Sequence, residues 1–322
     1  MRVWFLKETK TIDVDCGTGT NITLWTREDK VYRITPRQND AVNSCWMPDS
    51  HRLNYKYINA ETRIPQPVIR TDAEAPHRPS TWEPALASAA EAVKRIAPNQ
   101  LAIIASGRMT NEELYMVRHL AAQIGTDMVD IVPRMGESDG MLISADRNPN
   151  TNGARLVLDI EPGSRLDAIR EGVRSGSIKG ILSLGEDLIS PEAGFTAEDL
   201  DKLDYLFMTA HSANETARHA DLVLPGVTYA EKFGTMINVT GRIQRLNRAI
   251  QPIGYARDDW QIFRDITLLL GGNPALKDFN SALDILTAMS TEYGALNGVS
   301  WGSIGDGGQP ILETGVTIPV VE

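Results

Sequence analysis

The sequence predicts an α/β protein in which a small N-terminal β-rich module precedes a Rossmann-like domain with a parallel sheet. Two observations predict this order. Residues 1–60 carry short runs of β-branched and aromatic residues between turn signals, whereas strand and helix patterns alternate from about residue 80 onward. A proline-rich stretch separates the two patterns. We therefore expect four parts, namely a β module (1–60), an extended linker (61–79), a Rossmann-like domain (80–272) and a C-terminal helix with an irregular tail (273–322).

In the β module we expect strands at VWFLKE, NITLWT and KVYRITP, with a hairpin turn in TREDKVY. The segment that follows, residues 61–81, holds four prolines and no helical period. Proline fixes φ and removes a backbone donor, so this segment is predicted to be an extended connector rather than part of a core.

The Rossmann-like domain is predicted from alternating signals. Two helices begin at Ser/Thr caps, in STWEPALASAAEAVKRIA and TNEELYMVRHLAAQIG. Further helices are expected at RLDAIREGVRSGS and FTAEDLDKL, and a closing helix at DDWQIFRDITLLLGG. Buried strands are expected at NQLAIIASG, TDMVDIVP, ARLVLDI, IKGILSLGED, YLFMTAH and ADLVLPG. This alternation indicates parallel strands joined by right-handed crossovers.

Two irregular segments are expected to serve contacts. Residues 135–154 are expected to form a long polar loop rich in Gly and Asn. A loop of that length typically has a function or binds a partner. After Leu276 the sequence carries one more helical segment and a Gly-rich end. We expect that end to be irregular or docked on another chain.

The composition excludes several classes of protein. The chain has 322 residues, 42% of them hydrophobic, and a net charge of −10. That acidity, without a concentrated basic run, argues against a nucleic-acid partner. No apolar run approaches the roughly 18 residues of a membrane span, and the N-terminus does not have a signal-peptide pattern. Cys16 and Cys45, the two cysteines, exclude a disulfide framework and any four-cysteine metal site made by this chain alone.

Candidate catalytic groups are few. No G-x-G-x-x-G fingerprint follows a strand and no Walker motif is present, so an independent nucleotide site is not expected. His211 follows a predicted strand and is the candidate base of an alternative small-molecule-binding function. We favour instead a loop histidine before a helix that Ser212 and Asn214 cap. The other histidines are His51, His77, His119 and His219.

Charged residues near other element ends have structural interpretations. Glu186 and Asp187 follow a predicted strand and are interpreted as helix-start residues that complement the helix dipole. Arg242, Arg245 and Arg248 alternate along a segment that runs outward from the short strand TMINVT. We expect these three arginines to form salt bridges or a subunit contact.

The turn DVDCGTGTN is the one segment whose spacing suggests a metal. A C-x-x-C-x-x-x-C run followed about 27 residues later by another cysteine can hold a [4Fe–4S] cluster. Here Asp13, Thr20 and Pro48 stand at three of these positions, and only Cys16 remains. Cys45 lies out of register. One thiolate cannot hold four irons, so Cys16 is interpreted as a small turn residue.

A resemblance to a known family is carried by RVWFLKETKTIDVDCGTGTNITLW and KVYRITPRQNDAVNSCWMPDSHRLNYKYI. These segments resemble the iron–sulfur module that opens the molybdopterin-oxidoreductase-like part of the G subunit (75-kDa type) of NADH:quinone oxidoreductase, respiratory complex I. Related subunits occur in NAD-linked hydrogenases and formate dehydrogenases. The resemblance covers most of residues 1–270 and continues through GRMTNEELYMVRHLAAQIGTDMVD, ADRNPNTNGA, ILSLGEDLI and TAHSANETARHADLVLPGVTYAEKFGTMINVTGRIQRLNRAI.

The resemblance implies a degenerate iron–sulfur module followed by a domain of the molybdopterin-oxidoreductase type. The chain departs from the family at the missing cluster cysteines, and we expect it to begin after the ferredoxin-like region of family members and to be without their further lobes. We therefore expect a non-catalytic scaffold subunit in the peripheral arm of a complex I-like electron-transfer complex. No catalytic, cofactor-binding or metal-ligating residue is assigned to this chain.

Partners and location follow from the same resemblance. Iron–sulfur clusters and FMN are expected in partner subunits, including a ferredoxin-like iron–sulfur chain and the flavin subunit. The chain is expected on the cytoplasmic side of the inner membrane, peripheral, with membrane contact only through the complex. The alternative is a partial subunit of a molybdopterin-type oxidoreductase, such as an NAD-linked formate dehydrogenase or hydrogenase, completed by a partner chain.

Overall fold

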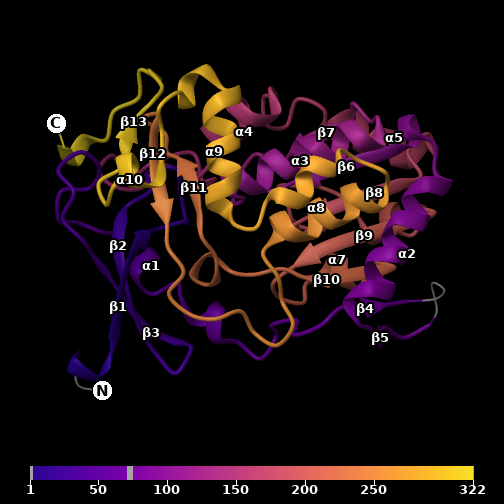
Figure 1. Cartoon of the computed structure of the whole chain (residues 1–322), viewed down its shortest axis with the longest axis horizontal. Helices are drawn as coiled ribbons and strands as arrows, with labels where there is room; N and C mark the ends of the chain where they lie inside the picture. The colour runs from indigo at the N-terminus through magenta and orange to yellow at the C-terminus, as the bar shows by residue number, and fades with distance from the viewer. Residues whose placement is uncertain (1–2, 71–74, 322) are drawn as a thin grey trace.

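A seven-stranded mixed sheet forms the centre of the molecule in a computed structural model that describes residues 3–70 and 75–321. The strand order is β5-β4-β10-β9-β8-β6-β7 (Figure 1). Neighbouring strands from β10 to β7 pair in parallel. These five strands are β6 (Leu101–Ala105), β7 (Val129–Ile131), β8 (Gly180–Leu184), β9 (Tyr205–Ala210) and β10 (Leu222–Pro225).

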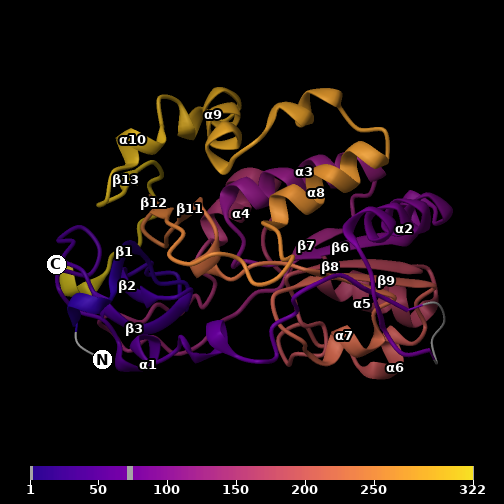
Figure 2. The same cartoon turned by 60° about the horizontal axis from the view of Figure 1, so that its bottom comes forward.

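Helices cover both faces of this sheet, as Figure 2 shows. One face carries α2 (Trp82–Arg95), α3 (Asn111–Ile124), α4 (Thr151–Leu158) and α8 (Asp259–Leu269). The other carries α5 (Leu166–Ser175), α6 (Ala197–Leu200) and α7 (Glu215–His219). The predicted α/β fold with parallel strands is thus confirmed. In the part of the chain that is described, no helix is both long and apolar enough to cross a bilayer.

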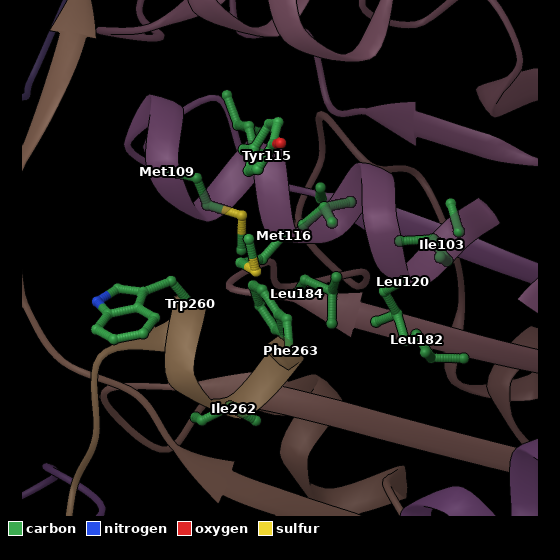
Figure 3. Packing of buried hydrophobic residues seen from close by; sticks show 14 of the residues in the cluster. Ile103, Met109, Tyr115, Met116, Leu120, Leu182, Leu184, Trp260, Ile262 and Phe263 are labelled. Carbon is green, nitrogen blue, oxygen red and sulfur yellow. The ribbon is translucent and has the colours of Figure 1, made fainter. Parts of the chain in front are cut away.

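The larger core lies between the sheet and the α3/α8 pair. Phe263 of α8 points toward Met116 of α3 and Leu184 of β8, all of them buried (Figure 3). Helix α3 has a complete capping box, in which Thr110 accepts a hydrogen bond from the Glu113 amide and the Glu113 side chain accepts one from the Thr110 amide. Helix α2 begins after Thr81 without a side-chain cap, so the predicted cap at this helix does not form.

One predicted strand is wrong. The apolar run in ARLVLDI lies in helix α4, whose buried residues include Ala154 and Val157, three positions apart on one helical face. Asp159 ends the helix in the left-handed conformation, with φ 55°. Short apolar runs fit a strand or a buried helix equally well, so periodicity alone did not distinguish them.

The N-terminal module is a three-stranded antiparallel sheet of β1 (Lys7–Ile12), β2 (Asn21–Arg27) and β3 (Lys30–Pro36). Its first strand begins later than the predicted VWFLKE run, which contains a 3₁₀ turn, η1 (Val3–Phe5). Glu28 and Asp29 both have positive φ, as expected for the predicted tight hairpin turn. The short helices α1 (Asp49–Arg52) and η2 (Lys56–Asn59) complete the module.

The predicted linker contributes to the large sheet. Strands β4 (Val68–Ile69) and β5 (Arg78–Pro79) add to its edge, and β4 runs antiparallel to β10. Residues 71–74 of this segment are outside the described residues. Proline has no backbone N–H to donate. An edge strand tolerates this where the missing N–H would face solvent, so a proline-rich segment can still pair at the edge of a sheet. The division of the chain at residues 60, 79 and 272 stays a prediction.

A third sheet joins the two ends of the chain. It contains β11 (Gly234–Ile237), β12 (Arg242–Leu246) and β13 (Gln309–Pro310). The tail after residue 276 holds α9 (Ala282–Glu292) and α10 (Trp301–Ile304) before β13 pairs with β12. The tail therefore docks on its own chain, where Asp306 pairs with Lys10 and Arg245. The remaining 3₁₀ turns are η3 (Pro98–Gln100), η4 (Tyr229–Glu231), η5 (Pro274–Asp278), η6 (Gly294–Leu296) and η7 (Pro319–Val321).

The sheet has its topological switch point between β6 and β8. Strand β6 pairs with β7 on one side and with β8 on the other. Helix α3 follows β6 on one face, and α5 precedes β8 on the opposite face. The loops after these strands therefore diverge and leave a crevice at their carboxyl ends, the position where open α/β sheets bind ligands.

We predict that Phe263→Ala lowers the free energy of unfolding by about 3–5 kcal/mol, because it leaves a cavity between α3 and β8. Urea unfolding followed by circular dichroism measures this loss. Leu269→Ala on the same helix, where the leucine is 46% exposed, is the matched control and should change the value by less than about 0.5 kcal/mol. Equal losses for both variants would contradict the core assignment.

Candidate functional site

A polar groove of about 850 Å³ opens at the carboxyl ends of the central strands. Arg108 follows β6, Arg134 follows β7 and Asp187 follows β8, and all three line the groove. The opposite wall comes from the N-terminal module, through Asp15 and His51. The groove thus lies at the switch point of the sheet and is shared by the two parts of the chain.

The Gly-rich turn of the N-terminal module is held between two other segments. The Gly17 amide donates to the Asp146 carbonyl, and the Gly17 carbonyl accepts from the Val239 amide, both at 2.8 Å. A Cβ on Gly17 would lie 2.4 Å from a Val239 methyl carbon, closer than side chains approach. The Thr18 hydroxyl donates to the Leu142 carbonyl at 2.7 Å. The turn therefore approaches the 135–150 loop and the β11–β12 hairpin of its own chain.

Asp13 and His51 form a buried ion pair within this module. His51 Nδ1 lies 2.6 Å from Asp13 Oδ2, and both side chains are nearly inaccessible to solvent. His51 was only one histidine among five in the sequence, and nothing in its spacing to Asp13 indicated contact. Asp13 directly follows β1, whereas His51 lies on the short helix α1, which packs against β3, so the two meet through tertiary packing that the sequence pattern does not encode.

Neighbouring charges shift the pKa values in this pair. Burial alone lowers the pKa of His51, but the hydrogen bond that its ring donates to Asp13 and the charges of Asp13 and Asp15 outweigh burial and raise the pKa. Burial and the Asp13 carboxylate raise the pKa of Asp15 to about 6, although Asn54 donates to both of its oxygens. Negative charge is therefore in excess at this end of the groove.

The residues present do not fit a [4Fe–4S] cluster. Of the four positions with the required spacing, Asp13 is bonded to His51, and Pro48 precedes α1 with no donor to offer. Burial and the Asp13 charge raise the pKa of the Cys16 thiol, which disfavours the thiolate that iron needs. The exposed Cys45 lies outside the spacing. One thiol among four positions cannot hold four irons.

Glu186 and Asp187 are not the helix-start pair that we expected, because no helix follows them. Glu186 is buried and forms a bidentate ion pair with Arg134, with one N–O distance of 2.8 Å. Asp187 accepts from the Thr216 hydroxyl at 2.6 Å and from the Thr216 amide in the first turn of α7. Asp187 therefore complements a helix start elsewhere in the chain.

Among the described residues, no carboxylate pairs with His211 to make it a base. Its ring contacts the Ser212 hydroxyl, and burial with nearby cations lowers its pKa to about 4. Asn214 caps α7 by accepting from the Ala217 amide, as expected. The remaining histidines are equally engaged: His77 bonds the Ala220 carbonyl, His119 packs edge-on against Tyr115, and His219 pairs with Asp201.

The three outward-running arginines form internal contacts. Arg245 pairs with Asp306 at 2.5 Å and Arg248 with Asp258 at 3.1 Å. Arg242 donates to the Gly308 carbonyl at 2.9 Å. The expected salt bridges are present for two of the three. Arg242 and Arg245 hold the C-terminal tail, and Arg248 holds Asp258, the residue before α8.

A second group of buried charges lies where α3 begins. Glu113 pairs with Lys232 through both oxygens at 2.8 Å. Glu112 accepts from the Thr235 amide and hydroxyl, both at 2.8 Å. Burial, with a smaller repulsion from Glu113, raises the pKa of Glu112 to about 7. These contacts fix β11 and η4 to the start of α3.

Comparison with known proteins gives two family matches. Residues 6–56 match the "NADH-ubiquinone oxidoreductase NDSU1/NuoG-like, 4Fe-4S domain", and residues 140–267 match "Molybdopterin oxidoreductase". Among solved structures, acetylene hydratase from Pelobacter acetylenicus aligns over 92% of this chain and 73% of its own, with a TM-score of 0.67 and 9% identity. That likeness shows the fold alone. The chain therefore has the architecture of the molybdopterin oxidoreductase class.

Several relatives matched by sequence are complex I subunits. The 78-kDa NADH-ubiquinone oxidoreductase subunit of Candida albicans is 25% identical over 87% of this chain and 55% of its own length. The corresponding NADH-quinone oxidoreductase subunit of Rickettsia conorii is 22% identical over 82% and 56%. A provisionally named formate dehydrogenase of Staphylococcus haemolyticus is 32% identical over 44% and 15%. The resemblance to the 75-kDa-type subunit is confirmed, and the chain spans about half the length of these complex I relatives.

The molybdopterin match implies a phosphate-bearing cofactor, which needs a surplus of positive charge or converging backbone amides. Apart from His51, which is paired with Asp13, three arginines and three carboxylates line the groove and balance in charge. They are Arg108, Arg134, Arg147, Asp15, Asp187 and Glu192. Arg134 is moreover committed to Glu186. These residues alone do not fit such a cofactor.

We predict that stability falls as pH rises from about 5 to about 8, in part through Glu112. The folded chain keeps this carboxyl protonated up to about pH 7, whereas the unfolded chain releases the proton near 4.5. The folded state thus binds more protons across this interval, and its stability declines by up to about 3 kcal/mol for this group. Urea titrations at several pH values measure the slope.

Glu112→Gln should flatten that slope, because glutamine does not titrate. The control is Glu91→Gln on α2, where the carboxylate is exposed and its ion pair with Arg95 is long at 3.9 Å. The control should keep the wild-type slope. An unchanged slope in Glu112→Gln would show that other groups carry the pH dependence.

Proposed function

We propose that this chain is a non-catalytic scaffold subunit of a complex I-like electron-transfer complex and that its own iron–sulfur site has been lost. The observation that supports this most is the Asp13–His51 ion pair, which takes up a ligand position that a cluster would need. The Gly-rich turn beside it is nevertheless retained in a closely packed conformation. A scaffold derived from a cluster-binding module would keep the packing of its Gly-rich turn after the residues that bind the cluster had changed.

The proposed partners are subunits that carry the redox groups. These include a ferredoxin-like iron–sulfur chain and the flavin subunit, with membrane contact only through the complex. Support comes from the relatives, which are named as complex I subunits. The N-terminal module also exposes aromatic side chains, with Trp4 71% and Trp46 55% accessible, which suits a contact surface.

A partial subunit of a molybdopterin-type oxidoreductase is the second candidate. It is favoured by the relative named as a formate dehydrogenase, which matches 44% of this chain, and by the position of the groove at the switch point. The balanced charge of the groove disfavours it unless a partner chain supplies the missing cations. A binding function that uses His211 has no support from the contacts of that ring.

The test is purification of the native complex through a tagged chain, with mass spectrometry of the partners and analysis of iron, acid-labile sulfide and molybdenum. We expect flavin-binding and iron–sulfur subunits to co-purify. The chain expressed by itself should contain neither labile sulfide nor molybdenum. Four irons with sulfide per isolated chain would overturn the loss of the cluster. A second large α/β chain with molybdenum would favour the alternative.

A further inference from the structure

The end of the groove formed by the N-terminal module gathers a ligand set that shares only Asp13 with the cluster positions. Asp13, Asp15 and His51 each present one ligand atom, and these atoms all lie within 4.8 Å of one another. Asp15 and His51 were not among the positions with cluster spacing. The set combines two carboxylates with an imidazole, which suits a single ion rather than a cluster.

The positions of these groups need little adjustment to hold an ion. Bonds of about 2.0–2.2 Å to zinc place tetrahedral ligand atoms roughly 3.3 Å apart. His51 Nδ1 and Asp13 Oδ2 are 2.6 Å apart, so an ion that replaces the shared proton moves them by less than about 1 Å. The Asn54 amide donates to both oxygens of Asp15 and so orients its carboxylate. Such outer contacts orient ligands in metal sites.

A buried hydroxyl without a hydrogen-bond partner among the described residues belongs to Thr20, which lies opposite Asp13. Thr20 is 0% exposed. The Asp13 amide donates to the Thr20 carbonyl, which continues the β1–β2 register in which Ile12 lies opposite Asn21. Residues directly opposite in an antiparallel pair project their side chains from the same face. The hydroxyl is therefore on the side of Asp13, where it can bond a ligand or a metal-bound water.

Charge and access agree with an ion at this site. Two carboxylates face one imidazole, and the Arg108 and Arg147 cations, which also line the groove, offset only part of that negative charge because they act on Asp15 and His51 more weakly than burial and Asp13 do. Asp15 and His51 both line the groove, so an ion has a path from solvent and room for a water ligand. Nitrogen with carboxylate oxygen favours a borderline transition metal over Ca²⁺, which takes six to eight oxygens.

We propose that Asp13, Asp15 and His51 bind one divalent transition-metal ion of the Zn²⁺ type, with water completing the coordination. This site goes beyond the scaffold function and revises the expectation that the chain has no metal-ligating residue. It requires no sulfide and no cysteine, but because it uses Asp13 it rests on the proposed loss of the cluster.

Isothermal titration of the chelator-stripped full chain with Zn²⁺ tests the proposal. We expect one ion per chain and, on Co²⁺ addition, the visible absorption of a four- or five-coordinate site. Asp15→Asn should weaken Zn²⁺ binding at least tenfold, and His51→Gln at least as much. Asp15→Asn can still accept from Asn54 and is partly exposed, so it should fold even if His51→Gln does not.

Asp49→Asn is the matched control, since this exposed carboxylate lies on the same short helix as His51 and pairs only with Arg52. It should bind Zn²⁺ like the wild type. Absence of one-to-one binding by the wild type would overturn the site. Binding that Asp15→Asn leaves unchanged would also overturn it.

Discussion

The backbone contact of Gly17 is the constraint on which the arrangement of the molecule depends. Its two backbone bonds join the N-terminal module to the 135–150 loop and to the β11–β12 hairpin, segments far apart in the sequence. Only glycine permits this approach, because any Cβ would collide with Val239. With the turn held there, the module closes over the carboxyl ends of the central strands. The groove exists because these parts meet at this contact.

Buried charges make the same arrangement specific. Lys232 and Glu113 tie the segment before β11 to α3, and Arg63 pairs with Glu231 at 2.5 Å between the linker and η4. A buried pair adds little stability over an apolar replacement, but separating its partners costs about 3–5 kcal/mol. Alternative packings of the hairpin would have to separate these charges. The hairpin that receives Gly17 is therefore held in one position, which in turn fixes the shape of the groove.

The sequence supports the fold more fully than the site, for a physical reason. Parallel strands such as β6 and β8 are continuous apolar runs next to capped helices, and these signals are local. The Asp13–His51 pair joins residues 38 positions apart through the packing of a one-turn helix, and no spacing rule predicts it. Likewise, the sequence around Glu186 resembles a helix start. Its actual partner, Arg134, follows a different strand, and local sequence does not show that the two are neighbours. The tail was expected to be irregular because the two-residue β13 is too short to give a period.

The proposed loss of cluster ligands is compatible with retention of the turn because the two depend on different atoms. The turn is held by the backbone of Gly17, by the Thr18 hydroxyl and by the Gly19 carbonyl, which accepts from Gln244 at 3.0 Å. None of these groups is at a cluster-ligand position. Replacing a thiolate at position 13 by a carboxylate therefore leaves the turn intact but places a charge in a buried site. His51 balances that charge through its imidazole, and the pairing creates a nitrogen and oxygen ligand set where sulfur would otherwise be needed.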